Sequence, residues 1–298
     1  MAGKGKETQV YVNGKFYPES QASVSVFDHG LLYGDGIYDT LCSWNRSIFR
    51  LREHIDRLYR SAHAVMLKIP LSKKKLSETI VETVRRSGFR NAYVKCLVTR
   101  GVGPQPLLDP RGCKPTLIVF CRPYMWLTGS SKGIGVRCKI TQTRQIPNDA
   151  LSRQVKNLNY LNFVLAKIEA IETGFDNALL PNLAGEVLEG PGLNLFLVKD
   201  RVLVTPPAGE ILEGITRTVI FDMAAELGIP VREESLTPYD CYTADEAFFC
   251  STAGGVVPIT DIDGRKIGSG KMGRISKVLE KTYFKWLESG RDGTPVKA

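Results

Sequence analysis

The chain has 298 residues, 43% of them apolar and 24% charged, and its formal net charge is +9. This is the composition of an ordinary globular protein, and it excludes collagen-like, low-complexity and disordered chains. At about 150 residues per domain, the length predicts two domains or one large unit. No apolar run approaches the roughly 18 residues of a membrane helix, and no apolar stretch follows the first residues, so we expect neither a membrane span nor a signal peptide.

The first half of the chain begins with a predicted β-hairpin, residues 9–12 and 15–17, because an Asn-Gly pair between them favours the tight turn. Ser72 and Gly88 have the residue types that begin and end a helix. The other predicted elements of this half are a glycine-rich stretch, two helices with apolar residues at helical spacing, and two strands, at 29–36, 53–68, 72–87, 91–99 and 116–121.

A break rich in proline, glycine and serine at 122–133 predicts a linker between a small domain, 1–121, and a larger one, 134–298. The second domain is predicted to begin with an alternating strand at 134–140. A helix is predicted at 158–173, and its aligned apolar residues are Leu158, Leu161, Leu165 and Ile168. Further strands and helices are predicted at 177–181, 194–198, 202–204, 216–227, 246–250 and from about Met272. Both halves mix strands and helices, so we expect an α/β or α+β fold.

The cysteine pattern argues against disulfides and a metal site, and the distribution of basic residues argues against a nucleic-acid partner. Seven cysteines and three histidines form no CxxC motif or Cys/His cluster, which argues against a disulfide scaffold or a metal site and favours a reducing cytoplasm. The densest basic run is only residues 73–75, and the other basic residues are dispersed among acids. We interpret the charge as a basic enzyme surface and expect no nucleic-acid or membrane partner. The alternative, a nucleic-acid-binding protein, would bind in a strongly salt-dependent way.

Lys156 is the first candidate for chemistry. It lies among apolar neighbours, just before the predicted helix at 158–173. Desolvation and the positive end of a helix dipole both disfavour an ammonium, and together they favour a nucleophilic amine. Taken alone, the residue could equally be an ordinary surface lysine.

Glu189 and two turns are the other candidates. Glu189 precedes two glycines and a strand, so a flat ligand could approach the backbone there and pair a protonated ring nitrogen with the carboxylate. The turns at 214–216 and 251–255 offer backbone N–H groups and hydroxyls that suit a phosphate. Taken singly, an exposed turn acid, an N-cap and a glycine turn explain these features as well.

In their order along the chain, these motifs resemble those of the class IV aminotransferases, which are pyridoxal-phosphate enzymes of fold type IV. The resemblance covers roughly residues 9 to 287. It is carried by Lys156 and by the motifs at 27–30, 33–36, 52–58, 189–196, 212–217 and 251–253.

The resemblance implies a role for each matching residue. Lys156 would hold pyridoxal 5'-phosphate as a Schiff base and then shuttle a proton. Glu189 would keep the pyridine nitrogen protonated, so that the ring serves as an electron sink. Tyr160 would hydrogen-bond the ring hydroxyl. The remaining implied cofactor contacts are Leu212 on the ring and four phosphate-binding residues, Arg57, Ile215, Thr216 and Thr252. The resemblance also implies at least a homodimer.

The substrate is expected to be an amino acid, with a 2-oxo acid as acceptor, as in branched-chain aminotransferases. The segments at 99–103, 108–113 and 156–162 resemble that group. Lys95 stands where the group has an arginine for the acceptor carboxylate, and it keeps the charge without the bidentate geometry. Backbone N–H groups near Ala253 would meet the α-carboxylate. The candidate walls of the apolar donor pocket are Tyr33, Tyr38, Tyr93 and Trp126.

Other reactions on the same scaffold remain open from the sequence. Tyr38 and the segments at 123–126, 154–157 and 251–255 also resemble (R)-selective amine transaminases. The Arg-x-His carboxylate trap of the D-amino-acid group is absent from residues 100–113. A D-amino-acid or (R)-amine transaminase is therefore the main alternative, followed by a lyase of the aminodeoxychorismate type.

Overall fold

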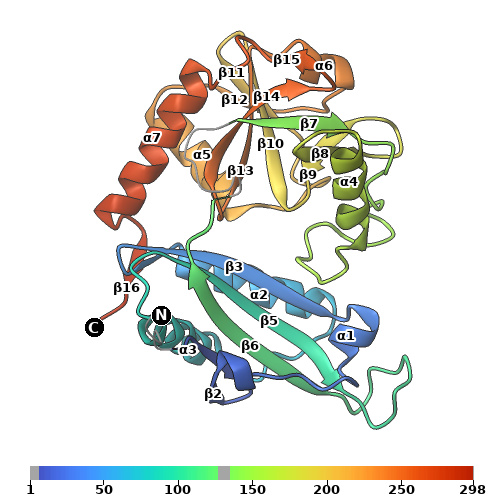
Figure 1. Cartoon of the computed structure of the whole chain (residues 1–298), viewed down its shortest axis with the longest axis vertical. Coiled ribbons are helices and arrows are strands. Elements are labelled where there is room, and N and C mark those ends of the chain that lie inside the picture. Colours follow the sequence, from blue (N-terminus) through green and yellow to red (C-terminus); the bar gives the residue numbers. More distant parts are fainter. Residues whose placement is uncertain (1–6, 127–134, 298) are drawn as a thin grey trace, which may run out of the picture. The chain divides into compact units, whose positions relative to one another are not determined.

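The computed structural model describes residues 7–126 and 135–297. The Cα atoms fall into two compact units. Unit 1 comprises Met1–Met125, Val155–Asn159 and Leu287–Ala298, and unit 2 comprises Trp126–Gln154 and Tyr160–Trp286. Each unit has its own sheet and its own helices (Figure 1), and each is described by itself below.

Unit 1 is built on a seven-stranded antiparallel sheet in the order β16-β4-β3-β5-β6-β1-β2. The strands are β1 (Gln9–Val12), β2 (Lys15–Pro18), β3 (Gly36–Trp44), β4 (Ser47–Phe49), β5 (Ala92–Val102), β6 (Lys114–Pro123) and β16 (Gly293–Pro295). The helices of this unit are η1 (Glu19–Gln21), α1 (His29–Tyr33), α2 (Leu51–Ala64) and α3 (Lys73–Ser87).

Local sequence signals explain where these elements begin and end. The predicted hairpin is confirmed as β1 and β2, and both turn residues, Asn13 and Gly14, have positive φ. The predicted second helix is confirmed as α3. The Ser72 hydroxyl accepts a hydrogen bond from the backbone N–H of Lys75, and Gly88 ends the helix in the left-handed conformation.

The two faces of the unit 1 sheet differ in what covers them. Helices α2 and α3 pack against one face (Figure 1). Along β5, Val94, Cys96 and Val98 alternate into the core that these helices share with the sheet. Side chains alternate across a strand, so Tyr93 and Lys95 lie on the opposite face. That face carries three of the candidate site residues of this unit, Tyr38, Tyr93 and Lys95.

Unit 2 contains a nine-stranded mixed sheet. Strand β9 pairs with both β8 and β10, so β10, β13, β14, β7, β8 and β9 form a closed ring around an apolar core. The strands are β7 (Val136–Ile140), β8 (Asn177–Pro181), β9 (Val187–Gly190), β10 (Leu193–Lys199), β11 (Val202–Thr205), β12 (Val231–Glu233), β13 (Glu246–Ser251), β14 (Gly255–Ile262) and β15 (Arg265–Lys266). The helices are α4 (Leu161–Glu172), α5 (Ile215–Glu226), α6 (Pro238–Tyr242) and α7 (Arg274–Ser289).

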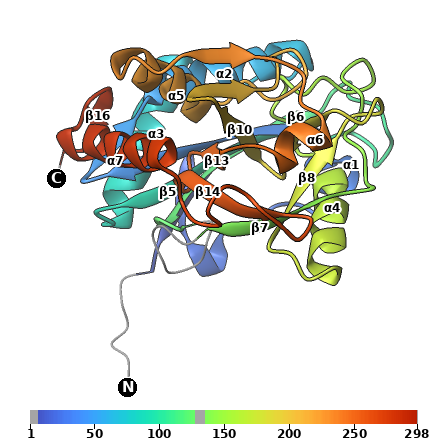
Figure 2. The same cartoon turned by 90° about the horizontal axis from the view of Figure 1, so that it is seen from above.

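Helix α4 packs on β8 (Figure 2), but not with its large aliphatic side chains. The small residues Ala166 and Ala170, together with Phe163, are buried against the sheet. The helix begins at Leu161, not at 158 as predicted, so Leu158 lies outside it. The other three residues that align in the sequence are exposed, Leu161 to 70% and both Leu165 and Ile168 to 49%. Helical periodicity identifies an apolar face, but it does not say what that face packs against.

The division into units differs from the domain limits expected from the sequence. Residues 155–159 associate with unit 1 through a bridge between Ile37 and Asn157, and β16 pairs with β4. Such pairings join segments distant in the sequence, which a reading of local composition does not detect. The domain limits stay a prediction, and most of the expected linker at 122–133 lies outside the described residues. No helix in the described part of the chain is long and apolar enough to cross a membrane.

Candidate active site

Lys156 lies in a short loop segment that is held against β3 of unit 1. Its backbone carbonyl accepts a hydrogen bond from the N–H of Tyr38 at 2.9 Å, and its own N–H donates to the Ser61 hydroxyl at 3.2 Å. The residue is only 8% exposed. These two hydrogen bonds therefore fix the backbone of Lys156, from which its buried side chain extends.

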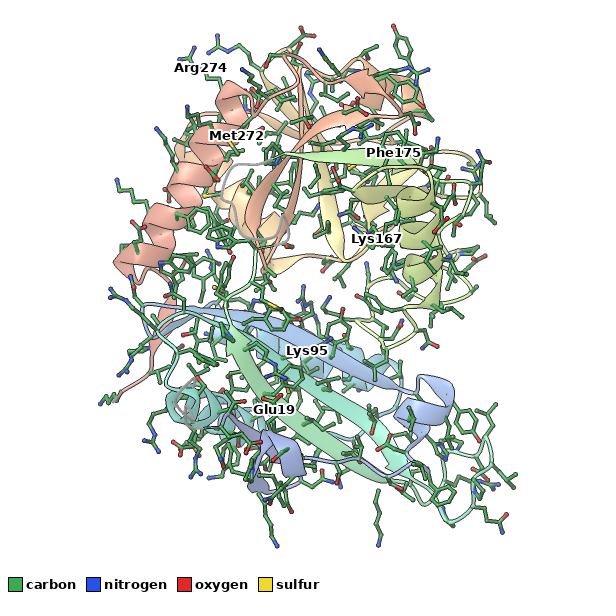
Figure 3. The ribbon with its side chains drawn as sticks, in the orientation of Figure 1. Glu19, Lys95, Lys167, Phe175, Met272 and Arg274 are labelled. Atoms are coloured by element: carbon green, nitrogen blue, oxygen red, sulfur yellow. The ribbon has the colours of Figure 1, made fainter. Side chains whose placement is uncertain are left out.

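Tyr38 contacts the amines of both candidate lysines of unit 1. The Lys156 Nζ atom lies 4.5 Å from the centre of the Tyr38 ring, and the Lys95 Nζ atom lies 4.4 Å from it. Lys95 projects from β5, the strand that pairs with β3 (Figure 3). Pairing of these strands thus brings together three residues that the sequence proposed for catalysis and substrate binding.

Arg57 is fixed beneath this face by a buried ionic cluster. Its Nε and Nη2 atoms donate to Asp39 at 2.9 and 2.7 Å, and the His54 Nδ1 atom lies 2.8 Å from Asp39 Oδ1. Burial alone would raise the pKa of Asp39, but the charges of Arg57 and His54 hold it well below its usual range. Burial lowers the pKa of His54, Asp39 opposes this effect, and the charges of Arg57 and Lys156 add to it.

The other predicted substrate residues are distributed over both units. Tyr93 lies next to Lys95 on β5, and its hydroxyl is 3.5 Å from that of Thr40. Tyr33 donates to the carbonyl of Pro106 at 3.1 Å. Trp126 belongs to unit 2, where its ring centre is 5.3 Å from that of Phe284.

Glu189 lies on β9 of unit 2, in a strand rather than in a turn, and it is 2% exposed. The Arg153 Nη2 and Nε atoms donate to Glu189 Oε1 at 2.9 and 3.2 Å, and the Gln145 amide donates to the same oxygen at 2.9 Å. Among the described residues, Oε2 accepts no hydrogen bond. The carboxylate is therefore buried and ionically paired, and one of its oxygens remains for a donor.

Strand pairing gathers the remaining cofactor residues of unit 2 near Glu189. Glu189 on β9 pairs with Asn194 on β10, and Asn194 pairs with Cys250 on β13. The turn at 251–255 therefore begins next to the last residue of this row across the sheet. That turn contains Thr252 and Ala253. The Asn194 amide also donates to the carbonyl of Leu212 at 2.9 Å.

Helix α5 begins directly after Leu212. Its N-cap is Gly214, and no side chain caps it. A Cβ atom at this position would collide with the amide oxygen of Asn194, so the close approach requires glycine. The first N–H groups of the helix, at Ile215 and Thr216, have no partner within the helix and are suited to an anion.

Tyr160 is the N-cap residue of α4, and its ring centre lies 5.2 Å from that of Phe163. Tyr160 follows Lys156 by only four residues, but the two belong to different units, Tyr160 to unit 2 and Lys156 to unit 1.

Each unit, taken by itself, provides residues of the kinds that bind pyridoxal phosphate. Unit 1 provides a buried lysine amine, and unit 2 provides a buried carboxylate and a helix N-terminus without a side-chain cap. The Gln145 Oε1 atom is buried and lacks a hydrogen-bond partner in the described part of the chain. A buried acceptor of this kind is uncommon in a complete structure and indicates a missing donor. Within the same residues, no group of three or more His, Cys, Asp or Glu could hold a metal.

Four residues of these two clusters were not singled out from the sequence: Asp39, His54, Gln145 and Arg153. Arg153 lies three residues before Lys156, and a charged residue in an otherwise apolar or amide-containing segment is the only local signal. Its partner, Glu189, is 36 residues away. Only the three-dimensional structure identifies such a pair.

Comparison with known proteins adds to this geometry. Residues 36–262 match the family model of Amino-transferase class IV. The chain is 47% identical over 277 residues to a protein of Methanocaldococcus jannaschii that is provisionally named a branched-chain-amino-acid aminotransferase. This match covers 92% of this chain and 95% of that protein. It is 32% identical over 288 residues to a D-alanine aminotransferase of Staphylococcus haemolyticus, covering 96% of this chain and 99% of that protein.

A solved structure also resembles this chain over nearly its full length. It is the T.th. branched-chain amino acid aminotransferase complexed with N-(5'-phosphopyridoxyl)-L-glutamate. The two share 33% identity with a TM-score of 0.90, over 98% of this chain and 99% of that one. The predicted mixed α+β fold and the predicted pyridoxal-phosphate transamination are confirmed. The chain belongs to the class IV aminotransferases.

Proposed function

We propose that this aminotransferase transfers the amino group of a branched-chain or similarly apolar L-amino acid to a 2-oxo acid, with pyridoxal phosphate as cofactor. The observation that carries the proposal is the buried amine of Lys156, which lies against Tyr38 on the face of the unit 1 sheet opposite α2 and α3. The similarity to branched-chain aminotransferases supports the choice of donor.

In unit 1, we assign the covalent hold on the cofactor to Lys156. When bound, pyridoxal phosphate supplies an electron sink for the electrons left by the proton of the donor Cα. Once the donor amine has taken its place on the cofactor, the freed Lys156 amine would accept that proton and return it. Arg57 contributes positive charge for the phosphate, and the fixed Asp39 cluster keeps its guanidinium in place.

In unit 2, we assign the ring-nitrogen contact to Glu189 and the ring-hydroxyl contact to Tyr160. Leu212 would pack against the ring. The N–H groups of Ile215 and Thr216 and the hydroxyl of Thr252 would bind the phosphate. The backbone at Ala253 binds the donor carboxylate.

Substrate recognition is assigned to the aromatic residues and to Lys95. Tyr33, Tyr38, Tyr93 and Trp126 bind the apolar side chain of the donor. Lys95, held 4.4 Å from the Tyr38 ring centre, pairs with the second carboxylate of 2-oxoglutarate.

The assignment of Lys95 predicts an acceptor-specific defect. A charge-assisted hydrogen bond contributes about 1.5–3 kcal/mol, so Lys95→Ala should raise KM for 2-oxoglutarate by about 10- to 100-fold and KM for pyruvate far less. Lys95→Arg, which keeps the charge, is the matched control. Equal rises in KM for both acceptors in steady-state assays would remove Lys95 from the acceptor site.

We also propose that the protein assembles as a homodimer in a reducing cytoplasm. The outer face of α4 and residues 24–32 of unit 1 both expose large aliphatic or aromatic side chains, which is typical of interfaces. Leu165→Glu combined with Ile168→Glu should lower the mass measured by sedimentation, whereas Leu183→Glu, at an exposed leucine outside these two segments, should not. All seven cysteines are free, which suits that compartment.

The half-reaction of the cofactor-loaded protein tests the proposed donor. L-leucine, D-alanine and an (R)-arylalkylamine are added separately, and the visible absorption of bound pyridoxal phosphate is followed. We expect bleaching by L-leucine, and no bleaching in Lys156→Ala. Lys167→Ala, at a half-buried lysine on α4 (Figure 3), is the control. Bleaching only by D-alanine or the amine would replace the donor with the alternative class.

A further inference from the structure

Arg153 and Glu189 form a buried ion pair in unit 2, with both side chains almost fully removed from solvent. A buried ion pair is costly to desolvate, and replacing it with apolar residues is often neutral or stabilising. Stability alone is therefore a weak explanation for its presence.

The hydrogen bonds of the pair are unequally distributed. Both guanidinium contacts and the Gln145 contact end on Oε1 of Glu189. A guanidinium can bind both oxygens of a carboxylate in parallel, as Arg57 does with Asp39 in unit 1. In unit 2, Arg153 and Gln145 together occupy one oxygen, and Oε2 accepts no hydrogen bond within the described residues.

Arg153 is itself held on two further sides. Its backbone N–H donates to the side-chain oxygen of Asn148 at 2.7 Å. Its guanidinium carbon lies 4.5 Å from the centre of the Phe163 ring, which in turn contacts Tyr160. Arg153 therefore contacts Glu189 directly and reaches Tyr160 through one aromatic ring.

We propose that Arg153 is a positioning residue that keeps the cofactor's ring nitrogen protonated through Glu189. In a buried site, a carboxylate paired with a protonated ring nitrogen can become neutral if the proton moves to the carboxylate. Arg153 is bonded to the carboxylate, so its charge stabilises the ionised form and opposes this transfer. By binding Oε1, it also leaves Oε2 for the ring N–H. This inference rests on the proposed contact between Glu189 and the ring.

The test uses pyridoxal phosphate labelled with ¹⁵N in its ring, bound to the full-length protein. The ¹⁵N chemical shift reports protonation of the ring nitrogen, a readout that a merely structural role would leave unchanged. We expect a protonated nitrogen in the wild type and an unprotonated one in Glu189→Gln. We expect Arg153→Gln to shift the signal toward the unprotonated value and to lower kcat by about 10- to 100-fold, as loss of partners that orient a functional ligand does.

Two comparisons isolate the charge of Arg153. Arg153→Lys keeps the charge and should retain the protonated signal. Arg137→Gln removes an arginine whose guanidinium carbon lies 5.0 Å from the Phe175 ring centre in the same unit, and it should have no effect. Arg153→Met is a second neutral variant, so that misfolding of one neutral variant still leaves the other to measure.

Each failure has its own signature. A protonated nitrogen in both neutral Arg153 variants, with an unprotonated one in Glu189→Gln, would overturn the role of Arg153 and leave that of Glu189 intact. A protonated nitrogen in Glu189→Gln would overturn the assignment of Glu189, and the role of Arg153 with it. A wild type that binds no pyridoxal phosphate would contradict the proposed function itself.

Discussion

Each unit buries one carboxylate against an arginine, but the two carboxylates use their oxygens differently. In unit 1, Asp39 Oδ1 accepts from His54, Arg57 and the backbone N–H of Thr40, and Oδ2 accepts from Arg57 Nε. In unit 2, the contacts to Glu189 all end on Oε1. The Asp39 cluster is complete within the protein, whereas the Glu189 cluster leaves an acceptor for a ligand. The pattern of hydrogen bonds, more than burial, therefore separates a carboxylate that only holds its arginine in place from one that keeps an oxygen for a ligand.

The largest expected effect comes from breaking the complete cluster. Asp39→Asn leaves Arg57 buried without its counter-charge, and removing one partner of a buried pair costs about 3–5 kcal/mol. The free energy of unfolding of the apoprotein, measured with urea, should fall by that amount. Asp109→Asn, which breaks the exposed pair with Arg111, should leave it unchanged. A fall of less than about 1 kcal/mol for Asp39→Asn would show that the cluster is not needed for stability.

Breaking the Glu189 cluster of unit 2 should lower the rate of the reaction. Glu189→Gln removes the charge that we assign to the ring nitrogen, and loss of such electrostatic stabilisation costs about 100- to 1000-fold in kcat. Arg153 loses its counter-charge as well, so stability also falls, and kcat is therefore measured per molecule of folded, cofactor-loaded protein. The variant should still bind pyridoxal phosphate. Unchanged kcat would mean that another group serves the ring nitrogen.

The smallest expected effect is a dependence of stability on pH, which arises from His54 and Asp39 of unit 1. The pKa of His54 is lowered in the folded protein, so the unfolded chain binds more protons as the pH falls through the ordinary histidine range. Stability should therefore decrease from pH 7 toward pH 5. The depressed pKa of Asp39 extends the loss below about pH 4, the ordinary range of an aspartate.

His54→Asn should flatten the dependence between pH 7 and pH 5 while it leaves the loss at lower pH in place. Urea unfolding at each pH measures both parts. The matched control is His63→Asn, which replaces the exposed histidine of the same helix. A curve for His54→Asn that is as steep as that of the wild type would assign the titration to another group.

The sequence predicted the elements whose signals are local. The Asn-Gly hairpin and helix α3, between Ser72 and Gly88, depend on residues adjacent to each boundary. The order of spaced motifs likewise identified the family and the cofactor. Strand β9 was missed because four residues with two glycines nearby suggest a turn, and its strand state depends on pairing with both β8 and β10.

Features that depend on distant contacts could not be predicted. The aligned aliphatic residues of α4 identified a face correctly, but Ala166 and Ala170 allow the opposite face to pack closely on the sheet. The pairing of Arg153 with Glu189 and that of Asp39 with Arg57 join residues on separate elements. A candidate for chemistry that depends on one residue type at one place, such as Lys156, can be proposed from a sequence, whereas its supporting contacts cannot.

The central claim is that Lys156 carries the cofactor. Lys95 is the alternative lysine for cofactor attachment within unit 1, because its amine lies at nearly the same distance from the Tyr38 ring centre as that of Lys156. Reduction of the pyridoxal-phosphate-loaded protein with sodium borohydride, followed by proteolysis and mass spectrometry, locates the covalent attachment. We expect a single phosphopyridoxyl group, on Lys156. A group on Lys95 or on another lysine, with Lys156 unmodified, would contradict the account.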